Sequence, residues 1–207
     1  MTQQNKSFNI DDKIAVFDQL GTIVNTQDAP DYYGVQFKET GKTYAVRAEH
    51  IETLSITDRI KTLEDAIDAL GEDNAYVKHL QIFNEQMNGC FSDQQDIKAF
   101  LELRIITAAL NEGWTPDWSD EDEYKYFPWF YICTAEEWEA MSDEDKSRCV
   151  GRSSNNSSAY GGLVFASAGY ASSYSGTNVG SRLVFKSRDL AMYCGKQFIE
   201  IWADFIL

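Results

Sequence analysis

Basic residues are scarce in this sequence. Eighteen lysines and arginines stand against 33 aspartates and glutamates, which gives a formal net charge of -15. A protein that binds duplex DNA neutralises phosphates with a broad basic surface, so we expect no duplex DNA binding. The acidic excess is typical of a soluble protein, and an alternative is a protein that mimics nucleic acid.

The residue types that usually build catalytic and metal sites are also few. The chain has two histidines, His50 and His79, and four widely separated cysteines without a CxxC pair. No Ser/His/Asp set, phosphate loop or paired metal-ligand motif is visible. We therefore predict no metal, no cofactor, no disulfide framework and no catalysis, with a site made only of carboxylates as the alternative.

Long hydrophobic runs are missing as well. No apolar stretch approaches the roughly 18 residues that a membrane-spanning helix needs. The N-terminal segment MTQQNKSFNIDDK is polar and does not resemble an export signal. We expect no membrane contact, and unpaired cysteines favour a cytoplasmic location.

What the sequence does contain is typical of an ordered α+β protein. Hydrophobic residues make up 43% of the chain and aromatic residues 14%. In the segment 1–56, the short β-like runs KIAVFDQ, GTIVNTQ, YGVQFKE and GKTYAVRAE are separated by turn residues such as Gly41. So many short strands in so short a segment predict a small SH3-like β-barrel. Such a barrel contacts peptides or nucleic acids, or serves only as a docking module.

Apolar residues at helical spacing then predict a helical segment over residues 57–112. In TDRIKTLEDAIDALG we expect Thr57 to cap the helix and Gly71 to end it. A second helix is expected around Tyr76–Met87. The third, within DQQDIKAFLELRIITAALNEG, is expected to end at Gly113 and to bury Ile97, Phe100, Leu101, Ile105 and Ala108.

Residues 113–207 are expected to form an aromatic-rich α+β domain with an antiparallel sheet. The acidic residues in 117–123 do not match a calcium loop, so a solvated loop is the preferred interpretation. In the following strand YFPWFYI, Pro128 predicts an edge position or a bulge because proline has no backbone N–H. Regular alternation places Trp129 and Tyr131 on one face.

Two capping signals follow that strand. Thr134 with Glu137 makes a capping box for a short helix, and Ser142 with Asp145 begins another turn. Further on, GLVFASAGYA and SRLVFKS are expected to pair as strands joined by a loop. The small residues and tyrosines of this hairpin indicate either an adaptable contact surface or a flat surface for close packing.

A long C-terminal helix is expected to start after Ser187, its predicted cap. Arg182, Lys186 and Arg188 gather around this start, where the helix dipole is positive and favours an anion. We expect Leu183 and Phe185 to face the core, with Val184 facing outward. A phosphate or carboxylate ligand would explain the basic cluster. The alternative is ion pairing with the acidic segments 117–123 or 136–145.

Several motifs carry a family resemblance. ALNEGWTPDW, EYKYFPWF, GRSS...GGLVFASA...VGSRLVFKSR and GKQFIEIWADFIL resemble an uncharacterised family of proteins from phages and prophages of Bacteroides and related gut bacteria. The resemblance covers mainly residues 95–207. It implies a viral or prophage product in the cytoplasm of a bacterial host cell, and it carries no catalytic residues.

These features together predict a non-catalytic phage or prophage accessory protein that binds a ligand or a partner. One version is a nucleotide-like anion bound during interference with host defence. The partner is otherwise a protein of the host defence or of the virion, and the alternatives are a structural or assembly protein and an acidic nucleic-acid mimic. The predicted ligand-binding residues are Trp129, Tyr131, Arg182, Lys186, Ser187 and Arg188.

Overall fold

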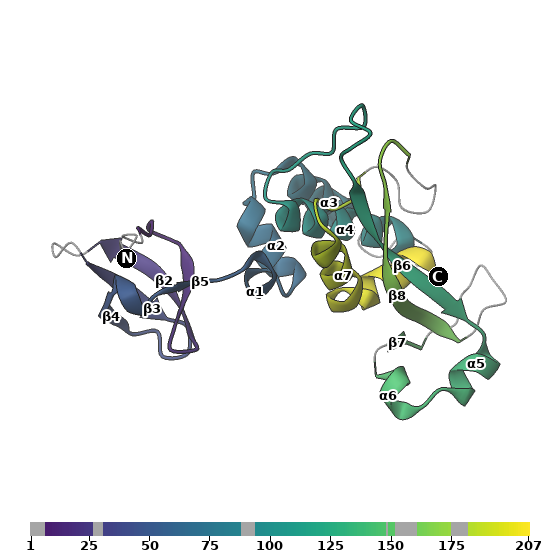
Figure 1. Ribbon diagram of the computed structural model, residues 1–207, viewed down its shortest axis with the longest axis horizontal. Helices are drawn as coiled ribbons and strands as arrows, with labels where there is room; N and C mark the ends of the chain where they lie inside the picture. The colour runs from purple at the N-terminus through teal and green to yellow at the C-terminus, as the bar shows by residue number, and fades with distance from the viewer. Residues whose placement is uncertain (1–6, 27–30, 88–93, 148, 152–160, 175–181) are drawn as a thin grey trace. The chain divides into compact units, whose positions relative to one another are not determined.

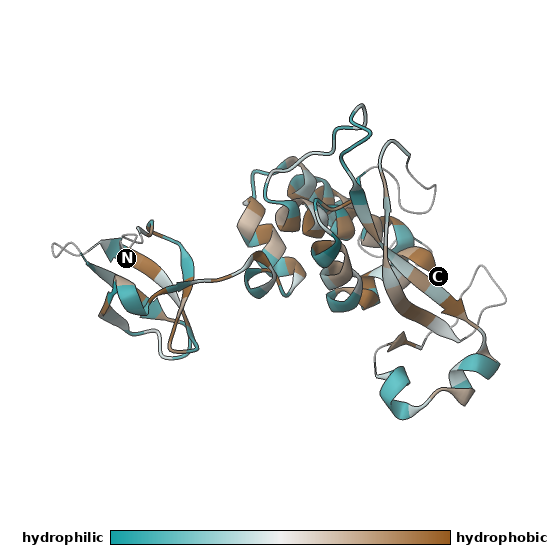
Figure 2. Cartoon of the chain, in the orientation of Figure 1, coloured by the Kyte–Doolittle hydropathy of each residue, from teal (hydrophilic) through white to brown (hydrophobic). Residues whose placement is uncertain are grey.

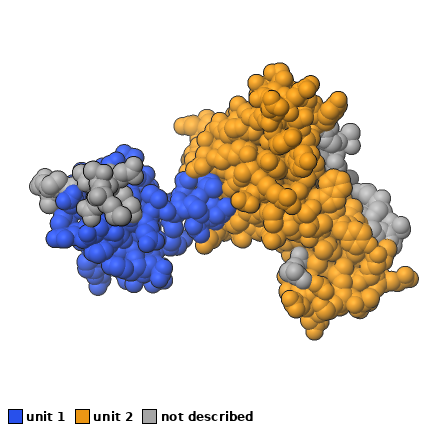
Figure 3. Space-filling view, in the orientation of Figure 1, with its two compact units in different colours: residues 1–59 blue, residues 60–207 orange. Residues whose placement is uncertain are grey.

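The chain is an α+β protein that divides into two compact units. The computed structural model describes residues 7–26, 31–87, 94–147, 149–151, 161–174 and 182–207 (Figure 1). Unit 1 is Met1–Arg59 and unit 2 is Ile60–Leu207 (Figure 3).

Unit 1 is built on a five-stranded antiparallel sheet with the strand order β4-β3-β2-β1-β5. Gly41, with a φ of 65°, lies in the turn between β3 and β4, as the sequence predicts. The elements are β1 (Lys13–Val16), β2 (Gln19–Thr26), β3 (Tyr32–Phe37), β4 (Thr43–Arg47), the 3-10 turn η1 (Ala48–His50), β5 (Glu52–Thr53) and the short helix α1 (Ile56–Arg59).

The expected SH3-like barrel is not confirmed, because the sheet of unit 1 does not close. Its edges are β4 and β5, and in the part of the chain that the structure describes no ladder joins them. One side of the sheet covers a small core of Phe8, Ile14, Val16, Ile23, Val35 and Ile51. Phe37 and Val46 pack against that core and stay partly exposed. The open edge therefore leaves part of the core-facing side accessible.

Unit 2 begins with three helices: α2 (Leu63–Leu70), α3 (Ala75–Met87) and α4 (Gln95–Asn111). The first starts later than predicted. Thr62, and not Thr57, caps α2 in a reciprocal capping box with Asp65, which fixes the first turn. Gly71 has a φ of 80° and ends the helix, as the sequence predicts.

Helix α4 spans the expected residues, but the expected buried face is only partly confirmed. Ile105 is fully buried as expected, whereas Ile97 is 45% exposed. The helix packs against α2, α3 and α8, and most of its buried residues lie in its second half. Burial is therefore nearly all-round there, and no single amphipathic face exists. The buried residues of α4 are Ala99, Leu103, Ile105, Ile106, Thr107, Ala109, Leu110 and Asn111.

A three-stranded antiparallel sheet in the order β6-β8-β7 completes the frame of unit 2. Its strands are β6 (Lys125–Cys133), β7 (Cys149–Val150) and β8 (Gly162–Ala171). Pro128 lies in the edge strand β6, and the register shifts one residue later, between Trp129 and Phe130. Both features agree with the prediction for a residue that cannot donate to a ladder.

Two short helices follow β6: α5 (Ala135–Ala140) and α6 (Asp143–Lys146). The predicted caps are confirmed, since the hydroxyls of Thr134 and Ser142 accept hydrogen bonds from the amides of Glu137 and Asp145. Neither helix buries a residue, and both are mainly hydrophilic (Figure 2). The acidic residues of this segment face solvent.

The predicted returning strand SRLVFKS is reduced to one bridge, between Phe185 and Tyr126. Val184, expected to face outward, is 3% exposed. The Asn111 side chain explains the difference: its Nδ2 donates to the Val184 carbonyl at 2.8 Å, and its Oδ1 accepts from the Lys186 amide at 3.1 Å. An α4 side chain thus takes the place of a neighbouring strand. The loop residues 175–181 lie outside the described residues.

The C-terminal helix starts where predicted but is divided in two. Ser187 caps α7 (Arg188–Gln197) by accepting from the Leu190 amide at 3.3 Å. Phe198 interrupts the helix, and α8 (Ile199–Ile206) follows. The interruption lets α7 pack on β6 and β8 while α8 packs on α4. None of the described helices is both long and apolar enough to cross a membrane.

Candidate functional site

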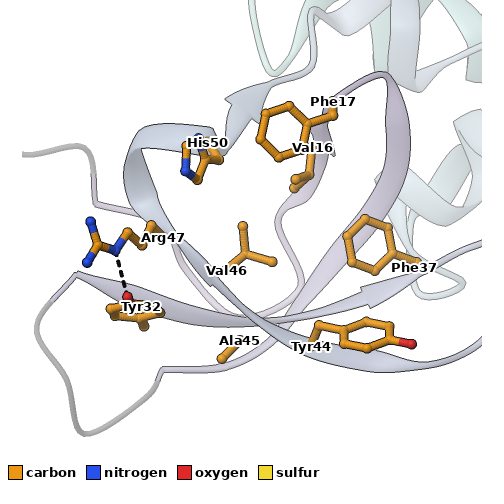
Figure 4. Close-up of a pocket in the computed structure, with 9 residues that line it drawn as sticks. All are labelled: Val16, Phe17, Tyr32, Phe37, Tyr44, Ala45, Val46, Arg47 and His50. Carbon is orange, nitrogen blue, oxygen red and sulfur yellow. Dashed lines mark hydrogen bonds between the residues drawn. The ribbon is translucent and has the colours of Figure 1, made fainter.

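A groove of about 360 Å³ lies on unit 1, at the open edge of its sheet (Figure 4). This volume is near the lower end of the range for ligand pockets. The groove is lined mainly by aromatic and aliphatic side chains, with Val46 in the middle (Figure 4). The lining residues, called the aromatic groove, are Val16, Phe17, Tyr32, Phe37, Tyr44, Ala45, Val46, Arg47 and His50.

The floor of the aromatic groove is the accessible part of the hydrophobic core. Val16 belongs to the core cluster, and Phe37 and Val46 pack against it. Tyr44 pairs with the core residue Val35 across β3 and β4, so its ring lies on the same side of the sheet. That ring is 54% exposed and makes an edge contact with Phe37 at 6.0 Å between centroids. An apolar side chain placed here would extend the core.

Phe17 forms one wall of the groove from a turn that does not favour phenylalanine. Phe17 and Asp18 connect β1 to β2, and both have positive φ, 48° and 65°. A two-residue turn with positive φ at both positions prefers Asn or Gly, and a bulky side chain there is strained. The Phe17 ring is nevertheless 74% exposed and lies 5.0 Å from the His50 imidazole. Strain held at an exposed aromatic residue is typical of a binding site.

The polar end of the groove is organised by Arg47. Its Nε donates to the Tyr32 hydroxyl at 2.6 Å, and its guanidinium lies 5.3 Å from the centre of that ring. Nη1 is 3.4 Å from Glu49, whose Oε1 also lies 3.6 Å from His50 Nε2. The Tyr32 and Glu49 contacts raise the pKa of Arg47, so it stays charged. The groove therefore combines an apolar floor with a positive group of fixed orientation.

The residues predicted for an anion site lie elsewhere, in unit 2. Ser187 is occupied as the cap of α7. Lys186 Nζ is 3.0 Å from Glu112 Oε2 just after α4, so one of the basic charges already has a partner. Arg182 and Arg188 are exposed. Across the described residues neither arginine is within ion-pair distance of the acidic segments 117–123 or 136–145.

Trp129 and Tyr131 lie on the side of the sheet that faces away from α7 and α8, where the Tyr131 hydroxyl donates to Glu137 of α5. Their neighbour Phe130 contacts Trp202 of α8 at 5.2 Å between centroids, so alternation turns Trp129 and Tyr131 outward. They are 54% and 46% exposed. Lys186, by contrast, is bonded at the end of α4. Among the described residues no ring contact joins Lys186 to Trp129 or Tyr131.

The acidic loop before β6 has a partner that the sequence did not indicate. Lys125 is fully buried, with Nζ 3.1 Å from Glu123 Oε2 and 3.0 Å from the Asp120 carbonyl oxygen. Its ammonium also lies 5.5 Å from the Trp118 ring. Hydrogen bonds from the Asp117 amide, Lys125 and Trp114 lower the pKa of Glu123. The acidic loop is therefore stabilised by Lys125, which follows it in the chain.

No metal centre is apparent in the described ranges, where no three His, Cys, Asp or Glu side chains are grouped to hold an ion. Comparison with models of protein families, with curated proteins and with solved structures gives no match for this chain. The resemblance to a phage family therefore stays a prediction, and function has to be argued from the geometry.

Sequence reasoning missed the aromatic groove, although part of its signal was present. Alternation within YYGVQF and TYAVR places Tyr44 and Val46 on one face together with Phe37. What alternation does not reveal is whether another element covers that face. The other available signal was Phe17-Asp18 at a turn where small residues are expected.

Proposed function

We propose that this protein is a non-catalytic binding protein whose unit 1 holds an extended segment of a protein partner in the aromatic groove. The observation that carries the proposal is Phe17, a strained and exposed aromatic residue at the mouth of an apolar groove. A solvent-exposed ring at positive φ costs stability, and a binding role gives a reason for that cost.

The shape and lining of the groove favour a peptide. Aromatic residues that are exposed next to an apolar floor are the usual anchors of protein recognition. Four of the lining residues of the groove, Tyr44, Ala45, Val46 and Arg47, are consecutive in the edge strand β4. An extended peptide can contact the whole length of such an edge strand, whereas a compact small molecule contacts only a short part of it.

The biological setting follows from the resemblance alone. A phage or prophage accessory protein that acts on a host-defence protein has a protein partner, and so does a virion assembly protein. The aromatic groove serves either role. The proposed nucleotide-like ligand near Arg182 and Arg188 has less support, because Lys186 is paired with Glu112 and the Tyr131 hydroxyl is bonded to Glu137.

Selection from a library of random short peptides tests the proposal. We expect the full-length protein to enrich apolar peptides, and Phe17→Ala or Tyr44→Ala to weaken their binding by about tenfold or more, as for residues at the centre of an interface. Tyr174→Ala is the matched control, because Tyr174 is 81% exposed and lies outside the groove in unit 2. Failure to enrich any peptide, or equal binding by all three variants, would overturn the proposal.

A further inference from the structure

The β4 strand presents an unpaired edge beside the aromatic groove. The ladder between β3 and β4 pairs Val35 with Tyr44 and Tyr33 with Val46. The Phe37 amide donates to the Lys42 carbonyl and the Ala48 amide to the Asp31 carbonyl, which fixes the alternation of hydrogen bonds along this ladder. The backbone groups of residues 42, 44, 46 and 48 therefore point to β3, and those of Thr43, Ala45 and Arg47 point away from it.

Within the described ranges, this edge lacks three of the features that often protect a free strand: a proline, a β-bulge and a covering strand. Among the described residues no strand pairs with its outer side, and β4 contains no proline and no register shift. Thr43, Ala45 and Arg47 are all exposed. Unprotected edges recruit other extended chains, because their N–H and C=O groups are a template for pairing. Ala45 and Arg47 also line the groove, so the edge and the apolar floor are one continuous surface.

We propose that the partner segment of unit 1 adds as a β-strand to the free edge of β4, so that alternate side chains enter the aromatic groove. This inference rests on the proposed function and names the binding mode. Hydrogen bonds to Ala45 and Arg47 hold the main chain of the segment. The groove between Val46 and Phe17 selects an apolar side chain, since residues of a strand alternate between its two faces.

Charge complementarity gives the direction of the added strand. Near the Arg47 end two exposed acidic residues, Asp31 and Glu49, outnumber the single cation Arg47. Near the other end Lys38 and Lys42 flank the turn between β3 and β4, with Glu39 between them. A segment with a basic residue at the Arg47 end and an acidic residue at the Lys42 end matches both. Antiparallel pairing is the more frequent and slightly more stable arrangement, so the basic residue comes first in the segment.

Designed peptides test this mode. The probe alternates valine with threonine, begins with lysine and ends with glutamate, and its control has the two charged ends exchanged. A proline-rich peptide with the same ends as the probe is the second control, because it is extended but cannot form a ladder. We expect the probe to bind more tightly than either control, and the amides of Ala45 and Arg47 to become protected from hydrogen exchange.

Methylation of the peptide backbone makes the test independent of any variant of the protein. In an added strand only every second N–H faces β4. Methylation at one set of alternate positions should reduce binding about tenfold or more, and methylation at the other set should have little effect. On the protein side, Ala45→Pro removes an outward N–H and no bond to β3, so it should abolish probe binding and preserve the β3–β4 ladder.

The outcomes separate the two proposals. A peptide could bind in the groove without protecting the amides of Ala45 and Arg47 from hydrogen exchange, or methylation could weaken binding equally at every position. Either result overturns strand addition but leaves the proposed peptide-binding function. Absence of groove binding by every peptide, designed or selected, overturns both. Concentration-dependent protection of the two amides without any peptide would show instead that a second copy of the chain occupies the edge, which also overturns the proposed partner.

Discussion

Both units contain an antiparallel sheet rich in aromatic residues, but only unit 2 covers the core-facing side of its sheet. There α7 and α8 lie against β6 and β8, and Phe130 contacts Trp202. In unit 1 no described helix covers the corresponding side, and rings such as Phe17 and Tyr44 are more than half exposed. The comparison shows that a similar strand pattern gives a closed core or a binding groove, depending on whether a second layer is present.

The bonded cations of the two units differ in burial. In unit 2 the ammonium groups of Lys125 and Lys186 both bond to carboxylates of their own unit. In unit 1 the side chain of Arg47 bonds to Tyr32 and Glu49 at the rim of the groove, where it remains exposed. Lys125 is buried and acts only within unit 2, whereas Arg47 lies at a surface that a partner can reach, as the exposed Arg182 and Arg188 of unit 2 do.

The largest expected effect concerns the two lysines of unit 2. Their ion pairs have nearly the same length, 3.1 and 3.0 Å, but Lys125 is fully buried and Lys186 is 34% exposed. Lys125→Met should lower the free energy of unfolding of unit 2 by about 3 kcal/mol, because it removes the hydrogen bonds that the buried ammonium donates to Glu123 and to the Asp120 carbonyl oxygen. Lys186→Met should change it by less than about 0.5 kcal/mol.

Urea unfolding followed by tryptophan fluorescence measures this difference, because all five tryptophans lie in unit 2. Equal effects of the two substitutions would contradict the proposed difference between the buried and the exposed ion pair. They would also weaken the contrast between internally paired charges in unit 2 and the exposed charge of Arg47.

A smaller effect is expected where α7 touches the sheet. A Cβ at Gly195 would lie 2.5 Å from Phe165 and 2.9 Å from Pro128, which is closer than such atoms pack. Gly195→Ala should therefore destabilise unit 2 by about 1–3 kcal/mol, although alanine favours helices. Ala45→Val on the exposed edge of unit 1 is the comparison, with a change of less than about 0.5 kcal/mol expected from hydrogen exchange of the Ile23 amide in unit 1. If Gly195→Ala leaves the urea midpoint unchanged, the close contact between helix and sheet is not present in solution.

Local structure was predictable from the sequence because its causes are local. The caps Thr134 and Ser187 and the stop at Gly71 were all predicted correctly, since each depends on neighbouring residues. Pro128 was also placed correctly, because a missing N–H restricts any strand in the same way. These features define the ends of elements and do not say how the elements pack.

The wrong predictions involve partners that are distant in sequence. Val184 is buried because Asn111, 73 residues earlier, holds its carbonyl group. Lys125 was not singled out, because only the folded loop brings Glu123 and Asp120 around its ammonium. The aromatic groove was missed for a related reason: its rings alternate like core residues, and only the three-dimensional structure shows that no described element covers them.

The smallest expected effect on stability comes from a substitution of Phe17, which should stabilise unit 1 and weaken peptide binding. Phe17 occupies a turn position with a φ of 48° that suits asparagine better than phenylalanine. Phe17→Asn should raise the free energy of unfolding of unit 1 by about 0.5–1 kcal/mol, because it relieves backbone strain. The same substitution removes the exposed ring from the groove, so binding of the selected peptides should fall about tenfold or more.

Hydrogen exchange of the Ile23 amide, which donates to the Asp12 carbonyl at 3.0 Å, reports the stability of unit 1. Phe17→Tyr is the matched control: it keeps the ring and the strain, so stability and binding should both stay near those of the original protein. A loss of stability in Phe17→Asn would mean that the ring contributes more by its contact with His50 than the turn costs. The exposed Phe17 would then be a structural residue, and the contrast between an open unit 1 and a covered unit 2 would no longer imply a binding site.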